Sequence, residues 1–184
     1  MSRKTHRVSP LRIVQIRDMA DFFRKKLRVD ELPLGLVIER MLESGLVDVL
    51  EDNDPLFKNG AEAKYVPEAG CVFLKRSDYD ACVRDTWARS KFTFWHEIGH
   101  WCLGHSLSFS RGEGVEGSEI QAFESSEWQA DQFAAEVLMP LDIIKTEKIY
   151  SVEGIIDRFG VSWDAARVRL KQLKNHGSID FYEI

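Results

Sequence analysis

The residues His96-Glu97-Ile98-Gly99-His100 form the pattern with the clearest chemical meaning in this sequence. Side chains four residues apart on a helix lie on one face, so His96 and His100 can both reach one cation. Glu97 follows the first histidine directly, where its carboxylate could take a proton from a water molecule that the metal makes acidic. The pattern predicts a metal-binding helix with Glu97 as the candidate catalytic residue, whereas two ordinary surface histidines are the simpler alternative.

A catalytic zinc site usually has a third protein ligand and leaves the fourth position to water. A third histidine six residues after His100 is not present, because Ser106 stands there. His105 is one position away, and Gly104 before it favours a helix end, so His105 is only a weak candidate ligand.

A second helix offers a carboxylate instead. Residues 126–138 carry an apolar stripe at helical spacing, and Glu127 and Asp131 share the face beside it. Glu127 can bind the metal, while Asp131 can accept a hydrogen bond from a ligand imidazole and so fix its tautomer. Two ordinary surface acids are the alternative, and the other acidic candidates for the third ligand are Glu124 and Glu119.

The remaining pattern predicts a mostly helical α+β chain with a small antiparallel or mixed sheet. Ser9 and Pro10 predict the start of a helix that runs to Leu27, and a second helix is expected over residues 33–45. Residues 65–74 are typical of a β-hairpin around a Pro/Gly turn, and a short helix is expected over 78–84. Residues 106–124 are typical of a loop.

Two or three further helices are expected in residues 126–174. Ser126 with Gln129 predicts a capping box. Residues 151–176 resemble a helix-turn-helix pair, with Ser151 and Ser162 as caps. The second helix of the pair carries the basic residues Arg167, Arg169, Lys171 and Lys174. We expect this pair to pack on the core or to dock a substrate, because direct nucleic-acid binding fits poorly with an acidic chain.

Composition limits the other classes of protein. The chain has 184 residues and a formal net charge of -5, a size and balance typical of a single globular domain over residues 1–184. Residues 1–9 form a basic tail, and no apolar run is long enough for a membrane span. Three cysteines without metal-like spacing favour a cytoplasmic protein without disulfides, and Cys102 is expected in the core.

Two sequence blocks resemble the ImmA/IrrE family of metallopeptidases. One is residues 89–100, and the more distinctive one is residues 127–140, which end in Leu-Met-Pro. The similarity extends over about residues 10–174, including Phe159-Gly160-Val161-Ser162. Trp95 departs from the small residue that is common before the first histidine.

The resemblance implies a thermolysin-like zincin core with His96, His100 and Glu127 as zinc ligands and Glu97 as general base. It also implies a protein substrate, usually a helix-turn-helix transcriptional repressor of a bacterium, phage or mobile element. Zn²⁺ is the expected metal, one ion per chain, although two histidines and a carboxylate also accept Mn²⁺ or Fe²⁺. An extended substrate could add as a strand near Cys71–Leu74.

A different class of function is compatible with the same scaffold. The chain could be a non-catalytic regulatory or DNA-binding module, such as a toxin–antitoxin or repressor partner. The complete set of two histidines, Glu127 and Glu97 favours the enzyme, because a module without catalysis has no chemical need of all four. The sequence indicates no oligomeric state, and the candidates for the oxyanion-stabilising residue are His105, Tyr150 and Arg167.

Overall fold

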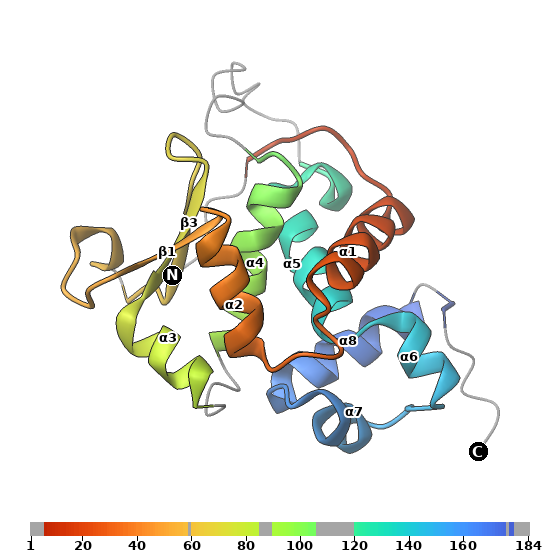
Figure 1. Ribbon diagram of the computed structural model, residues 1–184. Helices are drawn as coiled ribbons and strands as arrows, with labels where there is room; N and C mark the ends of the chain where they lie inside the picture. Colours follow the sequence, from red (N-terminus) through yellow and green to blue (C-terminus); the bar gives the residue numbers. More distant parts are fainter. Residues whose placement is uncertain (1–5, 59, 85–89, 106–119, 176, 179–184) are drawn as a thin grey trace.

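The computed structural model describes residues 6–58, 60–84, 90–105, 120–175 and 177–178. These residues form eight α-helices and one three-stranded sheet, which confirms the expected α+β class (Figure 1). The sheet lies with α2 (Leu34–Glu43) and α3 (Arg76–Val83) on one side of the molecule. The C-terminal helices lie on the other side, and α4 (Ser90–Cys102) and α5 (Ser126–Leu138) run between them.

The sheet has the strand order β1-β3-β2. β2 (Ala63–Val66) and β3 (Cys71–Lys75) form the expected antiparallel hairpin, and β1 (Val47–Leu50) pairs with β3 in parallel. β3 is therefore the central strand, with both sides paired. β3 itself therefore offers no free edge for the strand addition expected near Cys71–Leu74, and the neighbouring edge strand that contacts α4 is β2.

The N-terminal segment, residues 6–11, is extended rather than helical. Helix α1 (Ile13–Leu27) has Arg12 rather than Ser9 as its N-cap, so it starts three residues later than expected. The backbone of this segment pairs instead with residues 123–126: Val8 N donates to Glu124 O at 2.8 Å and Leu11 N to Phe123 O at 3.1 Å. The backbone N–H groups of this segment thus find their acceptors in residues 123–126, so they do not need a further helical turn to be paired.

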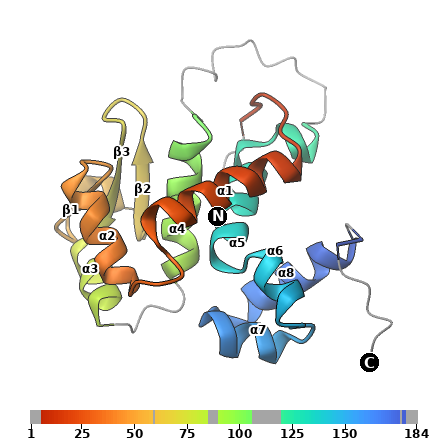
Figure 2. The ribbon, with the colours of Figure 1, turned by 45° about the vertical axis from the view of Figure 1, so that its right-hand side comes forward.

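Helices α4 and α5 pack closely because small residues lie between them. A Cβ atom added at Gly99 of α4 would lie 3.2 Å from Ala130 Cα and from Phe133 Cδ1 of α5. Figure 2 shows α1 crossing in front of this pair. The main core surrounds α4, and Trp95 is fully buried there, with its ring 6.2 Å from that of Phe23 and edge-on to it.

The C-terminal part consists of α6 (Leu141–Thr146), α7 (Val152–Phe159) and α8 (Trp163–Asn175). With α5 they make four helices after residue 125 in the described residues, whereas the sequence predicted two or three. The additional helix arises because the helical stretch is interrupted at Met139 and Pro140, and Pro140 is the N-cap of α6. Ser151 and Ser162 accept hydrogen bonds from Gly154 N and Ala165 N, as their expected capping roles require. α6–α8 and α5 share a second hydrophobic cluster.

Arg169 of α8 takes part in this packing rather than facing solvent. It is fully buried, its guanidinium binds Glu136 of α5 at 2.7 and 3.2 Å, and its Nε donates to Met139 O. One of the four basic residues that could have served a DNA-binding helix therefore points into the protein. The described residues include no helix with the length and apolar character that crossing a bilayer requires.

Candidate metal centre

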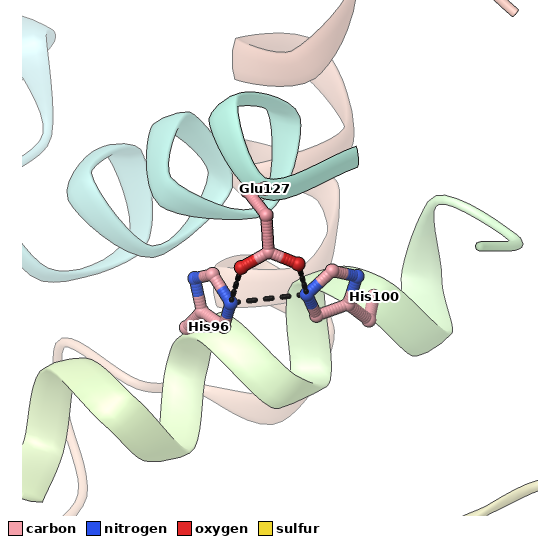
Figure 3. Close-up of side chains that lie close together, drawn as sticks. All are labelled: His96, His100 and Glu127. Carbon is pink, nitrogen blue, oxygen red and sulfur yellow. Dashed lines mark hydrogen bonds and ion pairs between the residues drawn. The ribbon is translucent and has the colours of Figure 1, made fainter. Parts of the chain in front are cut away.

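Two histidines of α4 and one glutamate of α5 converge on a single point (Figure 3). His96 Nε2 and His100 Nε2 lie 3.0 Å apart, and the carboxylate oxygens of Glu127 lie 3.4 Å from each of them. One ligand atom from each residue falls within a group no wider than 4.8 Å. His96 is almost fully buried, while His100 and Glu127 are partly accessible, as a site open to a substrate requires.

These distances fit a zinc ion. Ligand atoms about 2.0–2.2 Å from a tetrahedral Zn²⁺ lie about 3.3 Å from one another, close to the separations of 3.0 to 3.4 Å seen here. Two imidazole nitrogens and one carboxylate oxygen are also the donor set of many hydrolytic zinc sites with one open position. The three residues could therefore hold the metal with little movement.

The electrostatics of Glu127 are suited to metal binding. Burial by itself raises the pKa of this carboxyl group, but in the metal-free protein hydrogen bonds and charge interactions with His100 and His96 outweigh burial. These hydrogen bonds use the Nε2–H groups, whose place a bound metal ion would take. Together these interactions hold the pKa of Glu127 well below its usual range. The carboxylate is therefore ionised at neutral pH, which is the form that binds a cation.

Asp131 lies one turn after Glu127 on α5 and contacts the outer nitrogen of His96. Its Oδ1 is 2.7 Å from His96 Nδ1. A carboxylate there accepts the Nδ1–H hydrogen bond, which leaves the Nε2 lone pair facing His100 and Glu127. This is the contact that the spacing of Glu127 and Asp131 led us to expect.

Glu97 belongs to α4 but faces the sheet. Its Oε2 accepts a hydrogen bond of 2.8 Å from the backbone N–H of Tyr65 in β2. The carboxylate is thus held between the ligand helix and the outer strand of the sheet. The role of Tyr65 was not predicted, and no sequence signal could have found it, because the contact uses the backbone of a residue 32 positions away.

His105 and Gln129 form a second set of contacts behind the metal-facing side chains. His105 Nδ1 lies 2.9 Å from His100 Nδ1, and His105 Nε2 lies 2.9 Å from Gln129 Oε1. His105 thus contacts the outer nitrogen of His100, so the described structure does not bring it in as a third ligand. Burial lowers the pKa of His105 to about 4, although the hydrogen bond to Gln129 acts in the opposite direction.

Gln129 does not complete the expected capping box. The N-cap of α5 is Ser125, whose side chain accepts from Trp128 N at 3.2 Å, and Ser126 is the first helical residue. The side chain of Gln129 turns inward instead and donates to Ser9 O and Phe123 O. Gln129 comes two residues after Glu127 and so lies on the apolar side of the helix. That position was the sequence signal for an inward-facing side chain.

The remaining candidates lie elsewhere. Glu124 pairs with Arg7 at 3.4 Å, and Glu119 falls outside the described residues, as does most of the expected loop over 106–124. Burial raises the pKa of Cys102 to about 11, so its thiol stays protonated. Tyr150 packs against the second cluster, and Arg167 stacks over the exposed ring of Trp163.

A helical α+β fold with two histidines and a glutamate converging from two packed helices is the arrangement of a metallopeptidase. The IrrE N-terminal-like domain of peptidase family M78 matches residues 60–171, and the chain belongs to this family. The match includes both motif blocks and confirms the resemblance noted in the sequence, although it starts after α1, α2 and β1. A search of curated proteins gave no match to the chain.

Proposed function

We propose that this chain is a zinc-dependent endopeptidase that cleaves a regulatory protein. Membership of a peptidase family supports hydrolysis of peptide bonds, and the convergence of His96, His100 and Glu127 is the observation that carries the proposal. In this proposal these three residues hold one Zn²⁺, and Asp131 fixes the tautomer of His96.

Glu97 is the proposed general base. Bound zinc would supply Lewis acidity toward the scissile carbonyl and toward a water molecule. Glu97 would accept a proton from that water and pass it to the leaving amine. The N–H of Tyr65 orients the Glu97 carboxylate on the side facing β2. This restraint keeps the carboxylate in place before a substrate arrives, which reduces the ordering needed at reaction.

The substrate would bind in an extended form beside β2. Antiparallel strands alternate between paired and outward-facing backbone groups, and Tyr65 N already points outward to Glu97. A peptide strand added along the outer edge of β2 would run next to the metal-binding helix, because β2 is an edge strand that contacts α4. A helix-turn-helix repressor is the proposed substrate, cleaved in a segment that can become extended.

The alternative, a non-catalytic regulatory or DNA-binding module, predicts different behaviour. A DNA-binding module would use α8 to contact DNA, but Arg169 of this helix is buried against Glu136 and is not available as a surface cation. We therefore propose no direct nucleic-acid binding. Binding to duplex DNA that weakens steeply with added salt would favour the alternative.

The experiment compares the wild type with E97Q, using zinc-loaded protein and a panel of helix-turn-helix repressors. New protein termini are detected by mass spectrometry, and metal content is measured in the same samples. We expect E97Q to keep about one zinc per chain but to cleave at least about 100-fold more slowly, because it lacks the proton acceptor. Cleavage by E97Q at the wild-type rate would overturn the role of Glu97.

Two alanine variants control for the metal. E127A should lose most bound zinc and all cleavage, because it removes a ligand. E124A changes a nearby glutamate that pairs with Arg7, and it should keep the metal. A wild-type protein that takes up no zinc would contradict the peptidase proposal as a whole.

A further inference from the structure

A continuous chain of hydrogen bonds leads from His100 away from the metal-facing side. It passes through His105 and Gln129 and ends on two backbone carbonyl groups. One of these belongs to Ser9 in the N-terminal segment, which lies outside the residues matched by the peptidase family. His105 and Gln129 are only 7% and 1% exposed.

The direction of each hydrogen bond follows from its far end. Gln129 Nε2 donates to Ser9 O at 2.9 Å and to Phe123 O at 2.8 Å, and carbonyl oxygens can only accept. The amide oxygen of Gln129 must therefore face His105, so His105 Nε2 carries a hydrogen. In a neutral imidazole the other nitrogen is then an acceptor. His105 Nδ1 consequently accepts from His100 Nδ1–H.

This sequence of donors leaves the lone pair of His100 on Nε2, the nitrogen that faces His96 and Glu127. The opposite tautomer of His100 would put a hydrogen on Nε2. His100 Nδ1 and His105 Nδ1 would then face each other as two acceptors, with no hydrogen between them. His96 reaches the same state by a different route, through the half-exposed carboxylate of Asp131. The two histidines are thus oriented by groups of different charge and burial.

We propose that His105 and Gln129 are positioning residues that hold His100 in the tautomer and orientation that bind the metal, with the backbone carbonyl groups of Ser9 and Phe123 as their anchor. This inference rests on the proposed function, because it requires His100 to be a ligand. Groups that hydrogen-bond to metal-binding histidines contribute about 10–100-fold to metal affinity in other proteins. We expect an effect of that size here.

A pair of substitutions at position 105 tests the inference. In H105N the amide oxygen can occupy the place of Nδ1 and still accept from His100. In H105Q the polar atoms lie near the place of Nε2, so the contact to His100 is lost while a contact to Gln129 is kept. The apparent zinc dissociation constant is measured by competition with a chelator of known affinity. We expect H105Q to bind zinc about 10-fold more weakly or worse, and H105N to stay within about threefold of the wild type.

A second pair lies on α5. Q129L removes the link between His105 and the two carbonyl groups, whereas Q132L changes an equally buried glutamine, 1% exposed, whose Oε1 has no hydrogen-bond partner in the described structure. Only Q129L should weaken zinc binding. The absorption spectrum of the Co²⁺-substituted protein should change in Q129L and H105Q, because it reports ligand geometry rather than stability.

The outcomes separate the inference from the proposed function. If H105Q does not fold, as judged by circular dichroism, the comparison of Q129L with Q132L decides. Wild-type zinc affinity and an unchanged Co²⁺ spectrum in H105Q and Q129L would overturn the positioning role and leave the metal site intact. Equal losses in Q129L and Q132L would also overturn it, because they would show a packing effect. A wild-type protein that binds neither metal would overturn both.

Discussion

At the scale of single residues, the site combines one carboxylate that must be charged with one histidine that must be neutral. Glu127 is held ionised by His96 and His100, whereas burial of His105 lowers its pKa to about 4. A charged His105 could not accept a hydrogen bond from His100. Charge is therefore concentrated on the side of the imidazoles that faces the metal position, and the far side of His100 is neutral.

This arrangement predicts a pH dependence of stability for the metal-free protein. An unfolded histidine has a pKa of about 6.5, so between pH 6.5 and 4 the unfolded chain binds a proton at residue 105 that the folded chain does not. The contribution of His105 is fully present above pH 6.5 and decreases as the pH falls toward 4, by up to about 3 kcal/mol.

Urea denaturation of the wild type and H105N across this range measures the effect. The difference between their unfolding free energies should change in favour of H105N as the pH falls. A difference that stays constant from pH 7 to 4 would show that residue 105 does not titrate as described.

The three candidate metal ligands could be predicted from the sequence, whereas the contacts of His105 and Gln129 could not. His96 and His100 follow from residue type and helical spacing on α4, and the spacing of Glu127 and Asp131 places both on one face of α5. The spacing alone left Glu124 and Glu119 as alternative third ligands, and the family resemblance favoured Glu127. His105 follows Gly104, which has a positive φ of 69° and ends the helical repeat. Its partner Gln129 is 24 positions away, and only the packing of α4 on α5 brings the two together.

At the scale of elements, the contact between α4 and α5 controls the separation of the metal-facing side chains. G99A would place a methyl group within 3.2 Å of Ala130 Cα, a backbone atom that cannot turn away. We expect a loss of about 1–3 kcal/mol of stability from the overpacking. Zinc affinity should fall as well, because the histidines and Glu127 would move apart.

G35A is the matched control for this prediction. Its added methyl group would lie 3.2 Å from Val83 Cα, at the contact between α2 and α3. Thermal unfolding and chelator competition are measured for both variants. G35A should lose stability and keep wild-type zinc affinity. An equal loss of affinity in the two variants would argue against the control of the site by the α4–α5 contact.

Several elements could be predicted from local signals, and others depend on distant partners. The hairpin, α2 and α7 have Pro, Gly or Ser signals at their ends, which act locally. The segment around Ser9 has the same kind of signal but is extended, since its backbone pairs with residues 123–126. β1 was not predicted, because four residues carry little periodicity and its partner β3 is 25 positions away.

At the scale of the whole molecule, a buried ionic cluster joins parts of the chain that are distant in sequence. Glu136 of α5 binds Arg169 of α8 and Arg17 of α1, with a shortest distance of 2.7 Å to Arg169. Burial raises the pKa of Glu136, but the two guanidinium groups more than compensate and keep it below its usual range. We propose that the two hydrophobic clusters therefore belong to one cooperative domain.

R169M tests this proposal. R169M removes one of the two cations that bind the buried Glu136, and it leaves Met139 O without its donor. Because Arg17 still compensates part of the charge, we expect a loss of about 3 kcal/mol, the lower end of the range for a broken buried ion pair. Unfolding is followed by tryptophan fluorescence, by circular dichroism and by hydrogen exchange in α4 and in α8. The transitions should coincide in the wild type. Loss of protection in α8 alone, at a lower denaturant concentration than in α4, would show two separate units.

The parallel pairing of β1 with β3 has a consequence for how the family match should be used. A fragment limited to the matched residues 60–171 would lack β1 and α1. β3 would then present an unpaired, apolar strand to solvent, an arrangement that favours aggregation between chains. Phe133, whose ring packs 6.0 Å from that of Phe23, would also lose its cover. The segment that similarity detects is therefore smaller than the unit that pairs both sides of β3 and covers Phe133.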